Sequence, residues 1–359
     1  MGVESLDINV GLMVKCDKGS VARYLGGAVL ECDDVDYYIT PFNPPREVGL
    51  HANITSMVLT STALYVGYYN TIPGIIDVFD PNTLDVVHTF RAPRGHNSIT
   101  DLALSSTALY VGYYTVPGII DMLDPNTLDV IRIFEAQHDH AYIHDLALSS
   151  TALYVGYDTV PGIIDMLDPN TLYTINTFRA PSGHDHVRAL ALSSTALYVG
   201  YFTIPGIIDV LDPNTLKQIN TFEAPRGHNV IRALALSSTA LYVGYDTIPG
   251  IIDVLNPDTL DVVRTFTAPS GHNNASSLVL SSTALYVGYR IIILGIIDVL
   301  NLSTLESVID FSPCCGGYIV SNGGNASIMH GFNGVYTITP ISNDSIRVGD
   351  RVYSFIKTI

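Results

Sequence analysis

The chain has 359 residues, of which 47% are apolar and only 14% are charged, against about a quarter charged in an average soluble domain. This composition excludes a disordered chain, because such chains are poor in apolar residues. The net charge of −17 at pH 7 repels phosphate backbones, which argues against nucleic acid as a partner. The longest near-unbroken apolar stretch, Ile291–Ile297, is too short to span a membrane, so we expect no transmembrane segment.

The first residues, Met1–Leu6, contain neither the basic nor the apolar stretch of a secretory signal peptide. Three explanations stay open. The chain remains in the cell that makes it, leaves by a route without a signal, or has lost its signal by processing.

Internal repeats dominate the sequence. The string Ser-Thr-Ala-Leu-Tyr-Val-Gly-Tyr recurs at intervals of 44 or 45 residues, with its first tyrosine at Tyr65, Tyr110, Tyr154, Tyr198, Tyr242 and Tyr286. Each copy continues through Gly-Ile-Ile-Asp, a variant of Asp-Pro-Asn-Thr-Leu and a short Val/Ile-rich run that ends in Phe. Residues 51–311 are therefore six copies of one unit, and such a period indicates a repeat architecture.

Each unit contains four short apolar runs. In the second copy they are Ile99–Leu104, Ala108–Tyr113, Gly118–Leu123 and Asp129–Phe134, and each is bounded by Ser, Gly, Pro or Asn. Runs of this length, rich in Val, Ile, Leu and Tyr, are typical of strands and too short for helices. Four strands in about 44 residues predict one blade of a β-propeller, so we expect an all-β fold.

The repeat resembles a known family. Leu-Tyr-Val-Gly-Tyr, followed by Ile-Ile-Asp-Val-Leu-Asp-Pro-Asn-Thr-Leu-Asp-Val-Val, is similar to the YVTN-type propeller repeat of archaeal and bacterial surface-layer proteins. It resembles lactonase-like propellers and WD40 repeats more loosely. Gly-His before the first strand, as in Gly95-His96, looks like the Gly-His of WD40 repeats, although the chain has no Trp. The resemblance implies a propeller fold and leaves the function open.

The chain ends are expected to close the ring. Residues 1–50 precede the repeats, and residues 312–359 offer further strands at Tyr318–Val320, Ser327–Phe332, Gly334–Pro340 and Ser345–Val352. We predict a seventh four-stranded blade, built mainly by the C-terminal segment and completed by an N-terminal strand such as Tyr37–Thr40. Eight blades stay open, because the first 50 residues are long enough to make most of one.

Two rings of polar residues recur with the repeat, the histidines His51, His96, His140, His184, His228 and His272 and the aspartates Asp77, Asp121, Asp165, Asp209, Asp253 and Asp298. Equivalent atoms on successive blades are about 10 Å apart and cannot share one metal ion. We therefore expect each His and each Asp to be hydrogen-bonded within or between blades. Neither a metal nor another cofactor is predicted. A local metal site at the extra histidines His138, His144 and His186 is the minor alternative.

All four cysteines lie outside the repeats, at Cys16, Cys32, Cys314 and Cys315. If they are oxidised, a disulfide from the N-terminal to the C-terminal pair is favoured, because a bridge between adjacent cysteines is strained. Free thiols are the alternative. Asn-x-Ser/Thr sequons occur at Asn53, Asn274, Asn301, Asn325 and Asn343, and they permit glycosylation without arguing for it.

Positions that vary between the repeats are candidates for a binding site. After the second Tyr of the motif the copies have Tyr69, Tyr114, Asp158, Phe202, Asp246 and Arg290. At the start of the first strand they have Thr55-Ser56, Thr100-Asp101, His144-Asp145, Arg188, Arg232 and Ser276-Ser277. In a propeller both sets lie on the same rim, and mixed aromatic and charged residues are typical of an interaction surface. Drift on solvent-exposed loops is the alternative explanation.

The sequence therefore favours a non-enzymatic β-propeller that binds a protein or glycan, or neighbouring structural subunits, on the surface of a cell or of a virus particle. The first alternative is a lactonase-like enzyme whose site lies at the channel mouth around His144, Asp145, Arg188 and Arg232. The second is a cytosolic scaffold for protein interactions. No Ser-His-Asp order, phosphate loop or His-Glu-x-x-His motif supports a catalytic function.

Overall fold

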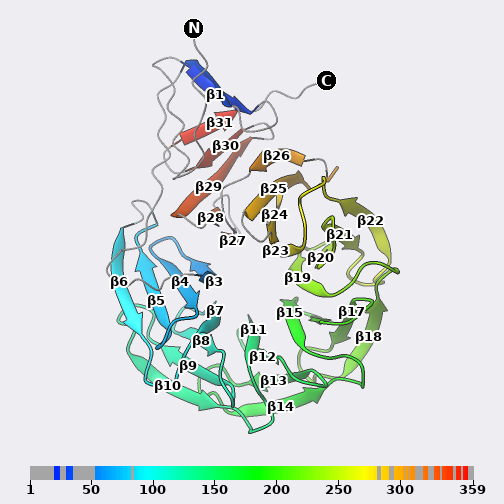
Figure 1. Cartoon of the computed structure of the whole chain (residues 1–359). Coiled ribbons are helices and arrows are strands. Elements are labelled where there is room, and N and C mark those ends of the chain that lie inside the picture. Colours follow the sequence, from blue (N-terminus) through cyan, green and yellow to red (C-terminus); the bar gives the residue numbers. More distant parts are fainter. Residues whose placement is uncertain are drawn as a thin grey trace.

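The computed structural model describes residues 53–81, 85–280, 284–290, 295–302 and 304–305, together with separate strands before and after them. Every regular element in this part of the chain is a β-strand, which confirms the expected all-β fold. Six four-stranded antiparallel sheets are arranged as the blades of a propeller (Figure 1).

Each blade uses four consecutive strands, and the first strand is the innermost. Blades 1 to 3 are β3 (Asn53–Leu59), β4 (Leu64–Tyr69), β5 (Ile75–Phe79) and β6 (Val86–Arg91); β7 (Ile99–Leu104), β8 (Leu109–Tyr113), β9 (Ile119–Leu123) and β10 (Val130–Glu135); and β11 (Ile143–Leu148), β12 (Leu153–Tyr157), β13 (Ile163–Leu167) and β14 (Thr174–Arg179). Blades 4 to 6 are β15 (Val187–Leu192), β16 (Leu197–Tyr201), β17 (Ile207–Leu211) and β18 (Gln218–Glu223); β19 (Ile231–Leu236), β20 (Leu241–Tyr245), β21 (Ile251–Leu255) and β22 (Val262–Thr267); and β23 (Ala275–Leu280), β24 (Ala284–Arg290), β25 (Gly295–Asn301) and β26 (Ser307–Phe311).

The hydrophobic core lies between blades. One buried cluster joins Tyr110 and Ile120 of blade 2 to Ile143, Leu153 and Val155 of blade 3, and equivalent clusters fill the next interfaces. The two central strands of a blade are buried along their whole length because both of their faces pack on neighbours. This arrangement explains why these strands are apolar throughout.

The glycine of Leu-Tyr-Val-Gly-Tyr is required by this packing. A Cβ atom on Gly156 would lie 2.6 Å from Cγ1 of Val187, on the innermost strand of the next blade. The first tyrosine of the motif ties more distant segments together, since the hydroxyl of Tyr154 donates to the carbonyl oxygen of Pro213 at 2.6 Å. The repeated motif therefore fixes the spacing of the blades.

The C-terminal strands form a sheet with five members, β27 (Tyr318–Ser321), β28 (Ser327–Gly331), β29 (Gly334–Ser342), β30 (Ser345–Val348) and β31 (Arg351–Ser354). Its first strand contacts β3 and β23, so this sheet lies between blades 1 and 6 (Figure 1). The prediction of seven four-stranded blades is wrong. The structure has six such blades, and the segment 345–352, expected to be one strand, contributes two strands to a five-stranded sheet.

The expected closure by an N-terminal strand is also wrong. Among the described strands, β1 (Ser20–Tyr24) and β2 (Leu30–Asp34) pair with each other, and β1 contacts β31. The C-terminal segment supplies all five strands of its own sheet, which leaves no position for an N-terminal strand within it. Tyr37–Thr40 lies outside the described residues.

The disulfide prediction is untested for the same reason. Cys16, Cys314 and Cys315 lie outside the described residues, and of Cys32 the structure describes only the backbone, in β2. A link between the N-terminal and C-terminal cysteines therefore stays a prediction.

Candidate binding site on one rim of the ring

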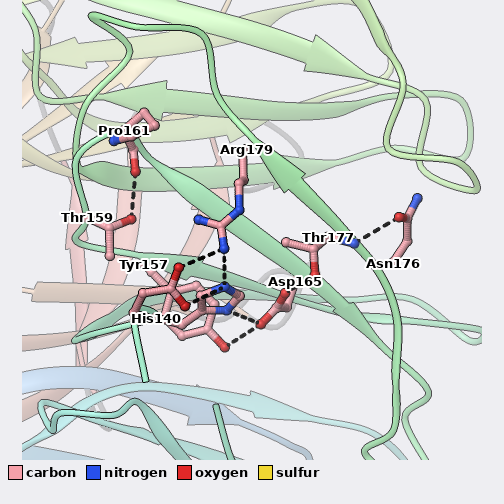
Figure 2. A network of polar contacts seen from close by, with 9 residues as sticks. His140, Tyr157, Thr159, Pro161, Asp165, Asn176, Thr177 and Arg179 are labelled. Carbon is pink, nitrogen blue, oxygen red and sulfur yellow. Dashed lines mark hydrogen bonds and ion pairs between the residues drawn. The ribbon is translucent and has the colours of Figure 1, made fainter. Parts of the chain in front are cut away.

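The repeated histidines and aspartates form hydrogen-bond networks inside single blades. In blade 3, Asp165 Oδ2 lies 2.8 Å from His140 Nδ1 and accepts from the hydroxyl of Tyr157 at 3.0 Å, while Asp165 Oδ1 accepts from Thr177 Oγ1 at 2.6 Å (Figure 2). Arg179 lies 3.3 Å from His140 Nε2. Because a guanidinium can only donate, Nε2 accepts, and Nδ1 carries the proton that is donated to Asp165.

The same pairing recurs around the ring, between His96 and Asp121, His184 and Asp209, His228 and Asp253, and His272 and Asp298. The aspartates in these pairs are buried. The prediction that both rings are hydrogen-bonded is therefore confirmed for these residues, while His51 lies outside the described part of the chain. Each network lies within its blade and has a structural role.

A β-bulge interrupts each innermost strand at the variable positions. In blade 3 the pairing with β12 passes from Ile143 to Asp145 and skips His144, and in blade 4 it passes from Val187 to Ala189 and skips Arg188. The same shift occurs in the other four blades. A bulge redirects side chains, and here it lies at the residues that differ between repeats. We call the bulges and the loops joining the second and third strands of each blade the rim.

In blades 1 to 3 the second residue of the bulge bonds to the next blade. Ser56 Oγ donates to Asp101 Oδ1 at 2.7 Å, and Asp101 Oδ2 accepts the backbone N–H of Leu146 at 2.8 Å. Asp145 Oδ2 accepts the N–H of Leu190 at 2.6 Å. Asp101 and Asp145 are also hydrogen-bonded to each other, so these side chains form a continuous chain along three blades.

Burial raises the pKa of Asp101, and burial together with the charge of Asp101 raises the pKa of Asp145 well above its ordinary value. Two carboxyl groups in contact cannot both be charged at low cost. The pair therefore holds a proton up to a higher pH than an exposed aspartate does. In blades 4 and 5 the equivalent positions are Ala189 and Ala233, which offer no acceptor.

The skipped residues of blades 4 and 5 are the cations Arg188 and Arg232. Arg232 donates Nε to Asp246 Oδ2 at 2.8 Å and forms an ion pair with it. Arg188 NH1 lies 3.4 Å from Asp158 Oδ2, and Asp158 Oδ1 lies 2.5 Å from His186 Nδ1. Both variable sets of the sequence thus meet on one rim, as predicted.

His144 lies beside these cations. Burial and the Arg188 guanidinium lower the pKa of His144 to about 4, so its imidazole is neutral at pH 7. Its Nδ1 atom is buried without a hydrogen-bond partner among the described residues, as is Arg188 Nε. Most buried polar atoms in native proteins have a hydrogen-bond partner, so these two atoms are exceptions.

Aromatic side chains complete the rim. The guanidinium carbons of Arg188 and Arg232 lie 5.0 and 5.4 Å from the ring centroid of Phe202, within the range of cation–π attraction. Tyr114 stacks on Tyr142 at 4.2 Å between ring centroids. Tyr69 meets the edge of Tyr114 at 5.7 Å. Of Arg290 the structure describes only the backbone, at the end of β24.

One set of rim residues was missed by the sequence analysis. The residue just before each innermost strand also varies, and in the structure it has a left-handed backbone, with φ between 50° and 56°, at Ser98, Tyr142, His186, Val230 and Asn274. Its N–H donates to a threonine carbonyl of the preceding blade. An alignment of the repeats shows that this position varies, and this variation could have identified these residues as part of the rim.

Comparisons with known proteins identify the fold and nothing finer. No family model matches the chain, and no curated protein sequence matches it. The crystal structure of the computationally designed Ika8 protein is similar, with a TM-score of 0.62, 16% sequence identity, and coverage of 86% of this chain and 89% of that one. Identity this low shows a shared fold alone. The similarity to YVTN repeats therefore stays a resemblance.

None of the elements in the described part of the chain is a helix long and apolar enough to cross a membrane. No three His, Cys, Asp or Glu side chains in that part of the chain form a group that could hold a metal ion.

Proposed function

We propose that this protein is a non-enzymatic β-propeller that binds a protein or glycan through its rim, displayed on the surface of a virus particle or a cell. One observation carries the proposal: the residues that differ between otherwise near-identical repeats meet on one rim. His144, Arg188, Arg232 and Phe202 come from three adjacent blades. Both guanidinium groups lie over the Phe202 ring, and the charges of both lower the pKa of His144.

The opposite rim supports this reading by contrast. There the Asp-Pro-Asn-Thr-Leu turns repeat the same internal bonds, as when Asp168 Oδ1 accepts the N–H of Asn170 at 3.0 Å and of Thr171 at 2.8 Å. Asp212 bonds its own turn in the same way. These exposed turns hardly differ between the repeats, whereas the rim gathers divergent charged and aromatic residues. The residue that follows each turn does differ, as at Asp129, Tyr173 and Lys217.

The test is a pair of double variants. Arg188→Ala with Arg232→Ala removes both guanidinium groups of the rim, whereas Arg91→Ala with Arg132→Ala removes two exposed arginines from the outer strands β6 and β10. Binding to a glycan array and to immobilised envelope or particle proteins is measured for both, together with the melting temperature. We expect only the rim variant to lose binding. Equal binding by both, with both folded, would contradict the proposal.

A hydrolase is the second candidate, because of one specific observation. Asp145 follows His144 in the sequence, and burial raises the pKa of its carboxyl, which suits general acid catalysis. Lactone hydrolysis by the purified protein that is lost in Asp145→Asn would favour this candidate. Recovery of the protein from the soluble cell extract, and not from particles or envelopes, would instead favour a cytosolic scaffold.

A further inference from the structure

Blade 4 contributes an incompletely bonded cation to the rim. Arg188 is mostly buried, with 17% of its side chain exposed, and its buried Nε has no partner among the described residues. The exposed part of this guanidinium can take an acceptor from a ligand.

The neighbouring arginine shows what a complete arrangement looks like. Arg232 engages Asp246 through both Nε and NH2. Asp158, which lies beside Arg188 on the preceding blade, accepts from His186 through Oδ1 at 2.5 Å and has only a 3.4 Å contact with Arg188. Arg188 is therefore the guanidinium of this group with donor capacity left.

The chemistry of the Arg188 guanidinium selects the ligand. A guanidinium binds planar carboxylates through parallel N–H donors. Asp158 and Asp246 border the same position. A dianionic phosphate would meet stronger repulsion from these carboxylates than a monoanionic carboxylate would.

The residues around Arg188 favour a protein ligand over a sugar. Both guanidinium groups lie over the ring of Phe202, and Tyr114 stacks on Tyr142. These contacts cover aromatic faces on which a sugar ring would otherwise stack. The loops of blades 3 to 5 instead expose aliphatic side chains, Val160 at 66%, Ile204 at 75% and Ile248 at 78%. Exposed aliphatic tips around a charged centre suit a protein segment with apolar residues beside an acidic one.

We propose that the rim of blades 3 to 5 binds an acidic protein segment, whose Asp or Glu side chain is held by Arg188 and whose apolar neighbours contact Val160, Ile204 and Ile248. This inference rests on the proposed binding function of the rim.

The experiment uses nine-residue peptides with blocked ends that carry one central Glu between aliphatic residues, and the same peptides with Gln. Wild-type protein should bind the best Glu peptides about tenfold more tightly than their Gln counterparts, as a charge-assisted hydrogen bond implies. Arg188→Gln should abolish this difference. Arg132→Gln, on the outer strand β10, should preserve it.

A second variant keeps the test valid if Arg188→Gln does not fold. Ile204→Asp changes a side chain that is 75% exposed, and should weaken the Glu peptides severalfold more than the Gln peptides, because like charges repel. Equal affinity of wild-type protein for Glu and Gln peptides, or no binding of either, overturns the inference.

Two further outcomes separate this inference from the proposed function. If Glu and Gln peptides bind equally and the binding is lost in Ile204→Ser, the rim is a binding surface and carboxylate recognition is wrong. If a sialylated oligosaccharide binds in place of the peptides and Arg188→Gln abolishes that binding, the rim recognises a carboxylate and the protein partner is wrong.

Discussion

The carboxyl groups of Asp101 and Asp145, on neighbouring innermost strands, are hydrogen-bonded to each other. The backbone N–H of Leu146 donates to Asp101 Oδ2 at 2.8 Å, and that of Leu190 donates to Asp145 Oδ2 at 2.6 Å. The two carboxyl groups therefore link blades 2, 3 and 4 only as long as one of them keeps its proton.

Asp145→Asn should stabilise the protein at alkaline pH. Because the pKa of Asp145 is raised above its ordinary value of 3.8, the folded state binds more protons than the unfolded state, and stability falls as the pH rises above about 4. Asparagine keeps a donor for Asp101 and an acceptor for Leu190 without titrating. Urea unfolding at pH 8 should show a gain of about 1–3 kcal/mol over wild type, and no gain at pH 3.

Asp168→Asn is the control, with the opposite sign. Hydrogen bonds from Thr171 hold the pKa of Asp168 below its ordinary value, so its contribution is present at neutral pH and is lost on acidification. A similar pH profile for both variants would show that Asp145 does not retain its proton.

Much of the fold followed from the sequence because it is periodic. A strand pattern that recurs six times leaves few other architectures, and the paired histidines and aspartates, such as His140 and Asp165, follow from the cost of burying a charge. The ends were predicted less well. Residues 345–352 lack a counterpart in the repeats, so nothing constrained their division into β30 and β31.

The site was predicted in position and not in detail. Variation between repeats pointed to His144, Arg188 and Phe202, and these lie together. The hydrogen bond between Asp101 and Asp145 depends on the bulge in each innermost strand, which shifts the register by one residue. Strand patterns do not reveal a bulge, since one extra residue leaves the alternation intact on either side of it.

His144→Thr should make the protein more resistant to acid. Threonine is the residue of blade 2 at this position, Thr100. The pKa of His144 falls from 6.5 to about 4 on folding, so the folded state binds fewer protons and wild-type stability declines as the pH falls from 6.5 to 4. At about 1.4 kcal/mol per pH unit, the variant should gain up to about 3 kcal/mol over wild type between pH 7 and pH 4. An NMR titration that places His144 near 6.5 would contradict this prediction.

Tyr157→Phe should destabilise blade 3 by about 1.5–3 kcal/mol. The Tyr157 hydroxyl is buried and donates to the Asp165 carboxylate at 3.0 Å, and hydrogen bonds to charged groups contribute about this much. Tyr173→Phe changes a side chain that is 72% exposed and should alter the free energy of unfolding by less than about 0.5 kcal/mol. Equal effects in urea denaturation would rule out a structural role for the network.

Ile133→Thr should stabilise blade 2, whose network lacks one member. In the other complete networks a threonine of the outermost strand donates to the buried aspartate, at 2.6 Å from Thr177 and 2.8 Å from Thr221. In blade 2 the residue opposite Asp121 is Ile133, and Asp121 Oδ1 is buried without a hydrogen-bond partner among the described residues.

The substitution should raise the free energy of unfolding by about 1 kcal/mol, because it satisfies this oxygen. Little apolar burial is lost, since Ile133 is 49% exposed. Ile131→Thr, two residues earlier on the same strand and 50% exposed, is the matched control, because its position does not face an aspartate. If both variants are neutral, or if both lose stability, the hydroxyl of threonine does not complete the network, and Asp121 is satisfied in another way.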